Sequence, residues 1–388
     1  MRVIDTAERR ARLGVRHHLS SPATDVVSVA GDLVGLHSSD PATVYLAARA
    51  RVAGLTVADL EEVLYDRRSL LRMLGMRRTM FVVPRDLAAV MDAACTKSFV
   101  SRERNRVIRM LENQGIADDG AAWLGRVETE TLAAVNELGA ATARELTAVV
   151  PDLGKKYTFG EGTSAATSGM STRVLFLLAT AALIVRGRPL GTWVSSQYRW
   201  SPMGSWIEGG LDPIDREAAK AELVRRWLLA FGPGTFTDIK WWTGWNVGET
   251  KMALRAAGAV EVQLDEDTGY LHGDDAGPSD DPAPWAALLP SLDPTVMGWK
   301  EREWYLRGHA GRLFDRNGNA GPTVWHSGRI VGGWAQHKDG EVVFALLEKL
   351  DSTAEGMVEA EAARLTEWLG DFRLKPRFRT PLDKDLAG

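Results

Sequence analysis

Two polar residues near the start of the sequence have the types and the spacing for hydrolytic chemistry. His37 and Ser39 stand in the run LHSSDP, with Ser39 directly before Asp40-Pro41. A neutral histidine accepts hydrogen bonds and can act as a general base near neutral pH, and a serine hydroxyl can help to hold a water molecule. These side chains point the same way only on extended backbone, because residues two apart do not share a helix face. The alternative is a polar junction between two helices without catalytic function.

The sequence predicts a helix on each side of this junction. Apolar residues at helical spacing indicate a first helix over residues 24–38. Asp40 is a typical N-cap and Pro41 a typical first helical residue, so a second helix is expected over 41–52. The residue before a proline avoids the helical region, so we expect the first helix to end near Ser38-Ser39. Both candidate side chains would then project from a helix end.

The composition is that of a globular protein from a reducing compartment. Of the 388 residues, 45% are hydrophobic and 25% are charged, and Cys95 is the one cysteine. A single cysteine excludes an intrachain disulfide and a multi-cysteine zinc site, and the histidines show no metal-ligand spacing. The longest apolar run, Val174–Val185, is too short to span a bilayer, and the polar N-terminus is no secretory signal. Glycine motifs that bind nucleotides are absent. We expect a cytoplasmic monomer without a membrane contact, metal or cofactor.

Positive charge gathers in one short segment although the net charge is −4. Within twelve residues that contain no acidic residue stand Arg67, Arg68, Arg72, Arg77 and Arg78. Such a patch can bind phosphates even on an acidic protein. The alternative interpretation is an exposed, solvated arginine face.

Three stretches repeat the element order of a winged helix–turn–helix, which is a helix, a short capped helix, a second helix and a β-hairpin. The short helices begin at Thr56, Thr142 and Thr235, each followed three residues later by Asp or Glu. A loop is expected at Gly154–Ser164, before the second hairpin, which is placed at 183–196. This repeat predicts an α+β fold with three tandem winged-helix modules, over residues 1–85, 86–205 and 206–275.

An acidic, proline-rich linker at 274–284 precedes a different kind of region. Residues 285–388 are expected to form a β-rich domain with a long hairpin whose tip is Lys338-Asp339-Gly340. A helix over 353–369 is expected to cover the sheet. The predicted strands are Thr323–Trp325, Arg329–Gln336 and Glu341–Leu347.

Longer motifs resemble a known family. The run LLPSLDPTVMGWKEREWYL, followed by LFDRNGNAGPTVWHSGRIVGGWAQ, resembles the bacterial winged-helix DNA-binding family that includes the AlkZ and YcaQ DNA glycosylases. The runs RARLGVRHHL, LHSSDP, MRRTMFVVP and TDIKWWTGW also fit, so the resemblance covers nearly the whole chain. It implies binding to double-stranded DNA and excision of bulky N-alkylated purines, including crosslinked nucleotides, without a metal or redox cofactor.

The sequence departs from the family at the junction. The characterised glycosylases carry Gln-x-Gln or Gln-x-Asp where this chain has His37 and Ser39. Hydrolysis of an N-glycosidic bond needs a water oriented at the sugar carbon. The matching positions imply that His37 is the principal catalytic residue and that Ser39, with its shorter reach, helps to hold the water. The alternatives are a non-catalytic protein that binds DNA or recognises damage, and a resistance protein that sequesters one lesion.

The family match and the charge pattern together predict the DNA contacts. One group lies in the arginine-rich segment, and the other lies in the C-terminal domain at a loop and at the hairpin tip. For the hairpin, the alternative is an exposed turn without a partner. The expected contacts are Arg67, Arg68, Arg77, Arg78, Thr79, Arg316, Asn317, Gln336, His337 and Lys338.

Overall fold

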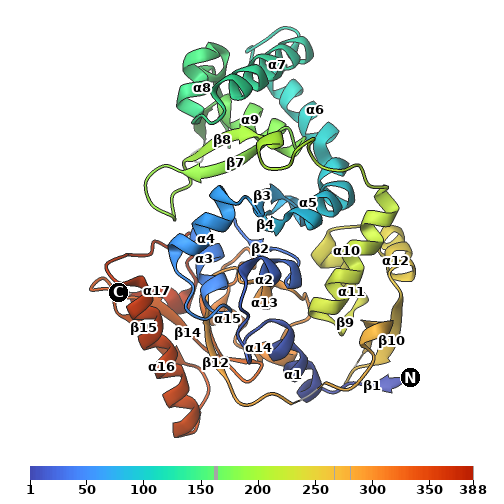
Figure 1. The fold of residues 1–388 in the computed structure, drawn as a ribbon, viewed down its shortest axis with the longest axis vertical. Helices are drawn as coiled ribbons and strands as arrows, with labels where there is room; N and C mark the ends of the chain where they lie inside the picture. The colour runs from blue at the N-terminus through green and yellow to red at the C-terminus, as the bar shows by residue number, and fades with distance from the viewer. Residues whose placement is uncertain (161–164, 266, 280, 388) are drawn as a thin grey trace. The chain divides into compact units, whose positions relative to one another are not determined.

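Helices and strands mix along the whole chain, so the fold is α+β as predicted (Figure 1). The computed structural model describes residues 1–160, 165–265, 267–279 and 281–387. The chain forms two compact units. The first comprises Met1–Leu60, Phe81–Pro84 and Lys220–Gly388, and the second comprises Glu61–Met80 and Arg85–Ala219. In the described part of the chain, no helix combines the length and the apolar character that crossing a bilayer requires.

The first unit begins with the elements that carry the candidate site. The helix before the junction ends at Asp32, so the prediction that it reaches Ser38-Ser39 was wrong. Val34 (φ 52°) and Gly35 (φ 102°) both adopt left-handed backbone, which a right-handed helix cannot continue. The elements are β1 (Arg2–Val3), α1 (Thr6–Arg16), α2 (Val26–Asp32), β2 (Leu36–His37), α3 (Pro41–Arg49) and α4 (Val57–Glu61).

The short strand β2 exists because it pairs with β4 (Met80–Pro84). Leu36 lies opposite Val82 and His37 lies opposite Phe81 in an antiparallel register. Gly35 permits this close approach, since a Cβ there would lie 2.9 Å from a methyl carbon of Val83. His37 therefore stands on extended backbone, as its proposed chemistry requires.

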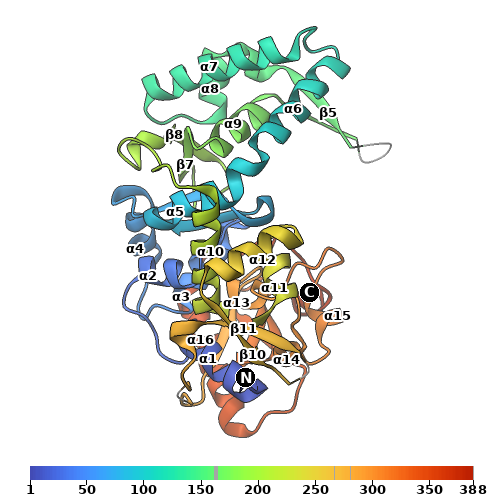
Figure 2. The same cartoon turned by 90° about the vertical axis from the view of Figure 1, so that its right-hand side faces the viewer.

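The segment around Thr235 has the predicted order of elements. Thr235 and Asp238 form a capping box at the start of α11, and Asn246 and Glu249 form another at the start of α12. Strand β1 joins the sheet of this segment, in the order β1-β10-β11-β9. Figure 2 shows β10 and β11 of this sheet. The elements are α10 (Arg216–Phe231), β9 (Gly234–Thr235), α11 (Phe236–Thr243), α12 (Val247–Ala256), β10 (Ala259–Gln263) and β11 (Thr268–His272).

The C-terminal region contains a four-stranded antiparallel sheet in the order β12-β13-β14-β15. The three predicted strands and the helix after them are confirmed, whereas β12 and the last helix, α17, were not predicted. Helix α16 packs on β12, β13 and β15, and α17 packs on β14 and β15. The elements are β12 (Ala286–Leu289), α13 (Pro294–Met297), α14 (Glu303–Leu306), α15 (Ala310–Leu313), β13 (Thr323–His326), β14 (Arg329–Gln336), β15 (Val342–Leu346), α16 (Ser352–Leu369) and α17 (Pro381–Ala387).

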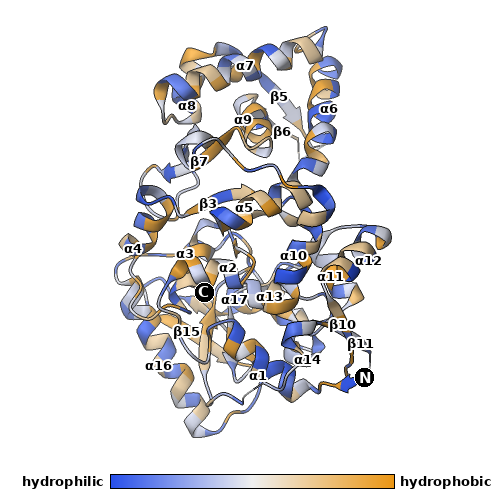
Figure 3. Cartoon of the chain, turned by 45° about the vertical axis from the view of Figure 1, so that its right-hand side comes forward, coloured by the Kyte–Doolittle hydropathy of each residue, from blue (hydrophilic) through white to orange (hydrophobic). Residues whose placement is uncertain are grey.

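The second unit has its own core, to which α7, α8 and α9 contribute Leu124, Leu146 and Val174. Helix α9 and the start of β7 are largely hydrophobic (Figure 3). Part of the run predicted as a loop is instead β5, because its residues pair with β6 in an antiparallel hairpin; Glu161–Ser164 lie outside the described residues. Strand β8 follows the run in which the second strand of the hairpin was predicted. The elements are β3 (Leu70–Leu74), α5 (Arg85–Met91), α6 (Lys97–Asn113), α7 (Gly120–Leu138), α8 (Ala143–Val149), β5 (Lys156–Phe159), β6 (Ala166–Gly169), α9 (Ser171–Thr180), β7 (Ile184–Pro189) and β8 (Tyr198–Pro202).

Candidate active site at the junction of β2 and α3

The structure places His37 and Ser39 in one turn between β2 and α3. His37 is 8% exposed, and the edge of its ring contacts Phe81 with 5.5 Å between ring centroids. The backbone N–H of Ser39 donates to His37 Nδ1 over 3.4 Å. Ser39 is half-buried and so keeps some contact with solvent. The backbone of Ser39 thus contacts the His37 ring, and the common direction of the two side chains stays a prediction.

The hydrogen bond from Ser39 defines the protonation of the His37 ring. An N–H can donate to Nδ1 only when that nitrogen carries a lone pair, so the proton of the neutral ring lies on Nε2. Nδ1 is then the acceptor of the imidazole. At 3.4 Å the bond is long and therefore weak, so a water molecule could compete with the backbone N–H for Nδ1.

Asp40 is the nearest carboxylate, and both of its oxygens have backbone partners. Oδ1 accepts from Ala42 N over 3.1 Å, which makes Asp40 the N-cap of α3 as predicted. Oδ2 accepts from Arg377 N over 3.3 Å, and the Arg377 guanidinium donates to the Ser39 carbonyl over 3.2 Å. Arg377 therefore holds the junction at two points, the Ser39 carbonyl and the Asp40 carboxylate. Sequence reasoning did not assign this C-terminal residue to the site.

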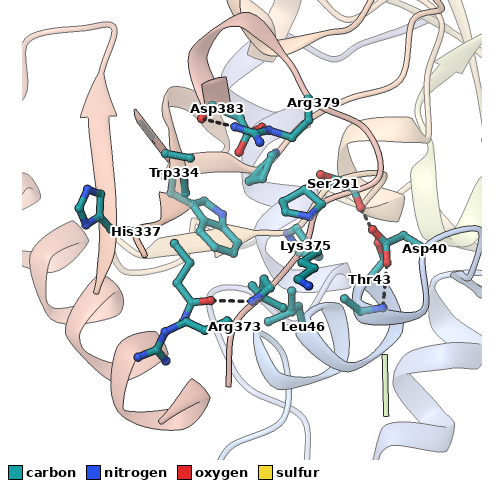
Figure 4. A pocket seen from close by; sticks show the side chains of 18 of the residues that line it. Asp40, Thr43, Leu46, Ser291, Trp334, His337, Arg373, Lys375, Arg379 and Asp383 are labelled. Atoms are coloured by element: carbon teal, nitrogen blue, oxygen red, sulfur yellow. Dashed lines mark hydrogen bonds and ion pairs between the residues drawn. The ribbon is translucent and has the colours of Figure 1, made fainter. Parts of the chain in front are cut away.

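A cavity of about 430 Å³ lies beside Asp40 (Figure 4). Leu46 from α3 and Trp334 from β14 give it apolar walls, and the Trp334 indole N–H donates to the Leu289 carbonyl over 2.9 Å. A cavity of this size can hold a drug-sized group. Among the described residues His37 and Ser39 are not part of its lining, which Asp40 reaches from the junction.

The cavity also contains a buried acid. Asp383, 2% exposed, forms an ion pair with Arg379 through Oδ2. Its Oδ1 has no hydrogen-bond partner in the described structure, and burial raises the pKa of the carboxyl group. A partnerless buried acceptor is costly, and Oδ1 has almost no accessible surface, so this carboxylate destabilises the fold locally.

The predicted hairpin is confirmed, with Gly340 in left-handed backbone (φ 110°) at the end of its turn. The amide of Gln336 has backbone partners: its nitrogen donates to Gly340 and Phe372, and its oxygen accepts from Leu374 N over 2.8 Å. His337 and Lys338 are exposed at the tip, and the His337 ring lies 3.2 Å from the Asp339 carboxylate. Gln336 thus holds the C-terminal segment in place, and the two tip residues face solvent.

The other C-terminal candidates lie in the loop after α15. Arg316 and Asn317 are both exposed. The Asp315 carboxylate accepts from the backbone N–H of Asn317 and of Asn319, which fixes the loop in a tight turn. The loop backbone is thereby ordered while the two candidate side chains face outward.

In the second unit, several residues of the arginine-rich segment have partners nearby. Arg67 lies 2.8 Å from Glu62, and Arg78 lies 2.9 Å from Glu103. Arg68 is half-buried and stacks over the Trp206 ring, with 4.8 Å from its guanidinium carbon to the ring centroid. Arg77 is exposed and Thr79 is half-buried.

The described residues contain no group of three or more His, Cys, Asp or Glu side chains placed to hold a metal ion.

Comparisons with known proteins connect this geometry to a family. A family model described as DNA glycosylase AlkZ-like matches residues 30–368. The fold is similar to the solved structure of the Streptomyces sahachiroi DNA glycosylase AlkZ, with a TM-score of 0.73 and 19% sequence identity over 95% of this chain and 98% of that one. No curated protein sequence gives a match.

Proposed function

Because the chain belongs to the family of AlkZ-like DNA glycosylases, we propose that it hydrolyses the N-glycosidic bond of N-alkylated purines in double-stranded DNA. The observation that carries this proposal is the position of His37 and Ser39 in one turn directly before the capped helix α3. The preferred lesions are purines alkylated at N7 of guanine or N3 of adenine, including bulky and crosslinked adducts.

In the proposed reaction, His37 Nδ1 exchanges its long hydrogen bond from Ser39 for one from the attacking water. The Ser39 hydroxyl holds the same water, which attacks the sugar carbon while its proton passes to His37 Nδ1. The cationic alkylated base leaves as a neutral base with the electron pair of the broken glycosidic bond. The transition state resembles an oxocarbenium ion, so the nearby charge of Asp40 stabilises it electrostatically. Asp40 keeps its capping bonds throughout and takes up no proton.

The cavity beside Asp40 supports the preference for bulky lesions. Its volume of about 430 Å³ exceeds the needs of a methyl group, and its Leu46 and Trp334 walls suit an apolar, flat adduct.

The DNA-binding surface is proposed to combine three winged-helix modules, over residues 1–85, 86–205 and 206–275, with the C-terminal domain at 285–388. Exposed Arg77 and the hairpin tip residues His337 and Lys338 are its proposed contacts. If the tip contacts DNA, shortening the hairpin to a two-residue turn lowers affinity. An unchanged affinity would leave it an exposed turn.

A second candidate function is non-catalytic recognition of damaged DNA. It is favoured by the hydrogen bond from Ser39 to His37 Nδ1, which occupies the nitrogen that the reaction requires. One assay separates the two functions. The protein is incubated with duplexes carrying N7-alkylguanine or N3-alkyladenine, and released base and alkali-labile sites are measured. Binding without release of any base would favour the second function.

A further inference from the structure

The segment between α16 and α17 alternates basic and apolar residues, and we name residues 371–380 the basic strap. Its cations are exposed, while the residues between them are half-buried. The strap contains no regular helix or strand. The basic residues are Arg373, Lys375, Arg377 and Arg379, and the residues between them are Leu374, Pro376 and Phe378.

Three of the four charges lack an acidic partner. The Arg373 guanidinium donates to backbone carbonyls, including that of Asp339 over 2.6 Å, and Arg377 donates to the Ser39 carbonyl. In the described part of the chain no carboxylate forms an ion pair with Arg373, Lys375 or Arg377. Arg379 differs, because it is paired with Asp383. The strap therefore presents positive charge that the protein does not neutralise.

The strap is fixed in place at both ends of its charged part. The Gln336 amide bonds to Phe372 and Leu374 at one end. At the other end, Arg377 N donates to the Asp40 carboxylate. Cα atoms two residues apart on this path lie at most about 7 Å from each other. That backbone spacing is comparable to the distance between successive phosphates of one nucleic acid strand, and the long side chains can adjust the positions of the charges.

We propose that the basic strap binds the phosphodiester backbone of the DNA strand that carries the reacting nucleotide, an inference that rests on the proposed function. Lys375 and Arg377 contact phosphates. Arg377 is in addition a positioning residue, because it joins the strap to the Ser39 carbonyl beside His37. The acids near the strap leave Lys375 and Arg377 without a carboxylate ion-pair partner among the described residues: Asp40 is buried under its capping bonds, Asp383 is paired with Arg379, and exposed Asp371 lies at the far end. Exposed Asp339 offsets part of the charge of Arg373 only.

The test measures duplex affinity against salt concentration by fluorescence anisotropy. Each phosphate contact contributes about 0.9 to the slope of log affinity against log salt, so Lys375→Ala with Arg377→Ala should lower the slope by about two. The control, Lys349→Ala, removes an exposed charge elsewhere in the same unit and should leave the slope unchanged. Lys375→Glu, at an exposed side chain, tests the same point if the double variant does not fold.

The outcomes separate this inference from the proposed function. If the wild type releases base and the folded double variant keeps its slope, the strap inference is overturned and the glycosylase stands. If the wild type binds the duplex but releases no base, while the strap variants lose slope, the glycosylase fails and the strap stands. A wild type that binds no duplex overturns both.

A second measurement tests Arg377 as a positioning residue. At saturating DNA, Arg377→Ala should lower the rate of base release several-fold, whereas the control Lys349→Ala should leave that rate unchanged. Arg377→Lys should restore affinity more fully than rate, because an ammonium lacks the fork of donors that serves the Ser39 carbonyl and a phosphate together. Equal saturating rates in both alanine variants would overturn the positioning role.

Discussion

Residues 67–78 and the basic strap differ in how many of their cations form ion pairs within the protein. In the segment around residues 67–78, Glu62 and Glu103 pair with Arg67 and Arg78, and Arg68 stacks on Trp206. In the basic strap, three of four cations have no carboxylate partner among the described residues. The first segment was conspicuous in the sequence because it contains no acidic residue, yet two acids outside it lie against it: Glu62 shortly before it and Glu103 farther along the chain.

This difference shows that local charge in a sequence is a poor measure of charge available to a ligand. A surface ion pair already satisfies much of a cation's interaction, so forming a phosphate contact requires breaking it. An unpaired cation has no such competitor. The predictions below follow from distinguishing arginines that hold the fold, arginines that face outward, and the junction that is proposed to perform the chemistry.

The largest expected effect is on rate and belongs to the junction. His37→Ala should lower base release by about 10²–10⁴-fold, the usual contribution of a positioned acid–base group. Duplex affinity should stay nearly unchanged, because the strap supplies the phosphate contacts. Ser39→Ala should lower the rate of base release by a smaller factor than His37→Ala. Single-turnover assays with an alkylated duplex measure both rates.

One double variant and one pH profile at the junction sharpen this contrast. Glutamine at both positions, His37→Gln with Ser39→Gln, should raise activity on simple alkylpurines, because an amide carbonyl accepts a hydrogen bond from water without needing deprotonation. If neutral histidine is the working form, wild-type activity should fall at acidic pH. Full activity in His37→Ala would move the catalytic residue elsewhere.

The next largest effect concerns an arginine that holds the fold. Arg51 and Asp293 are fully buried and lie 2.6 Å apart, and Arg51 also donates to the carbonyl of His17. Arg51→Ala leaves a buried carboxylate without its cation, so the free energy of unfolding should fall by about 3–5 kcal/mol. Chemical denaturation measures it. Arg364→Ala, at an exposed ion pair with Glu361, should cost less than about 1 kcal/mol. Equal losses would contradict the contrast.

The sequence predicted those parts of the fold that local chemistry determines. The capping boxes at Thr56, Thr142 and Thr235 are present, because each depends on residues three apart. The C-terminal hairpin and the cap at Asp40 were also correct for the same reason. Turn and cap residues act within a few positions, so their signals survive without knowledge of the tertiary structure.

The missed features depend on contacts between distant parts of the chain. The left-handed backbone at Val34 follows from pairing of β2 with β4, and a β-branched residue gives no local sign of it. The bond from Arg377 to Asp40 joins residues 337 positions apart. The alternating run RLKPRFR was the available signal for the strap, but alternation alone does not show which of its basic side chains form ion pairs with carboxylates.

A smaller effect concerns stability and pH at His17. This histidine is fully buried between Thr295 Oγ1, at 2.8 Å, and the Ala230 carbonyl, at 3.1 Å. Burial, and after it the nearby charge of Arg51, holds the pKa of His17 well below 6.5. Below about pH 6.5 His17 is protonated in the unfolded chain but stays neutral in the folded chain. The contribution of His17 to stability is therefore fully present above that pH and is lost as the pH falls below it.

The expected loss is up to about 1.4 kcal/mol of unfolding free energy per pH unit below that point. Urea denaturation at pH 7.5 and 5.5 measures it. His17→Gln should be less stable at pH 7.5 and should depend less on pH. A pH dependence that is the same in the wild type and His17→Gln would show that other groups cause it.

The smallest expected effect returns to the arginine-rich segment of the second unit. Arg77→Ala with Arg78→Ala should lower the salt slope by about one at most, because Arg78 is held 2.9 Å from Glu103 and only part of its charge is available to a phosphate. Affinity should fall less than about fivefold, as for a partly compensated surface charge. Both residues have left-handed backbone, with φ of 53° and 62°, and alanine is no more strained there than arginine, so the variant should fold. Glu103→Gln frees Arg78 and should raise affinity slightly. If this double variant lowers the salt slope as much as Lys375→Ala with Arg377→Ala, ion pairs within the protein do not weaken the binding of a cation to phosphate. The contrast between the two segments would then fail.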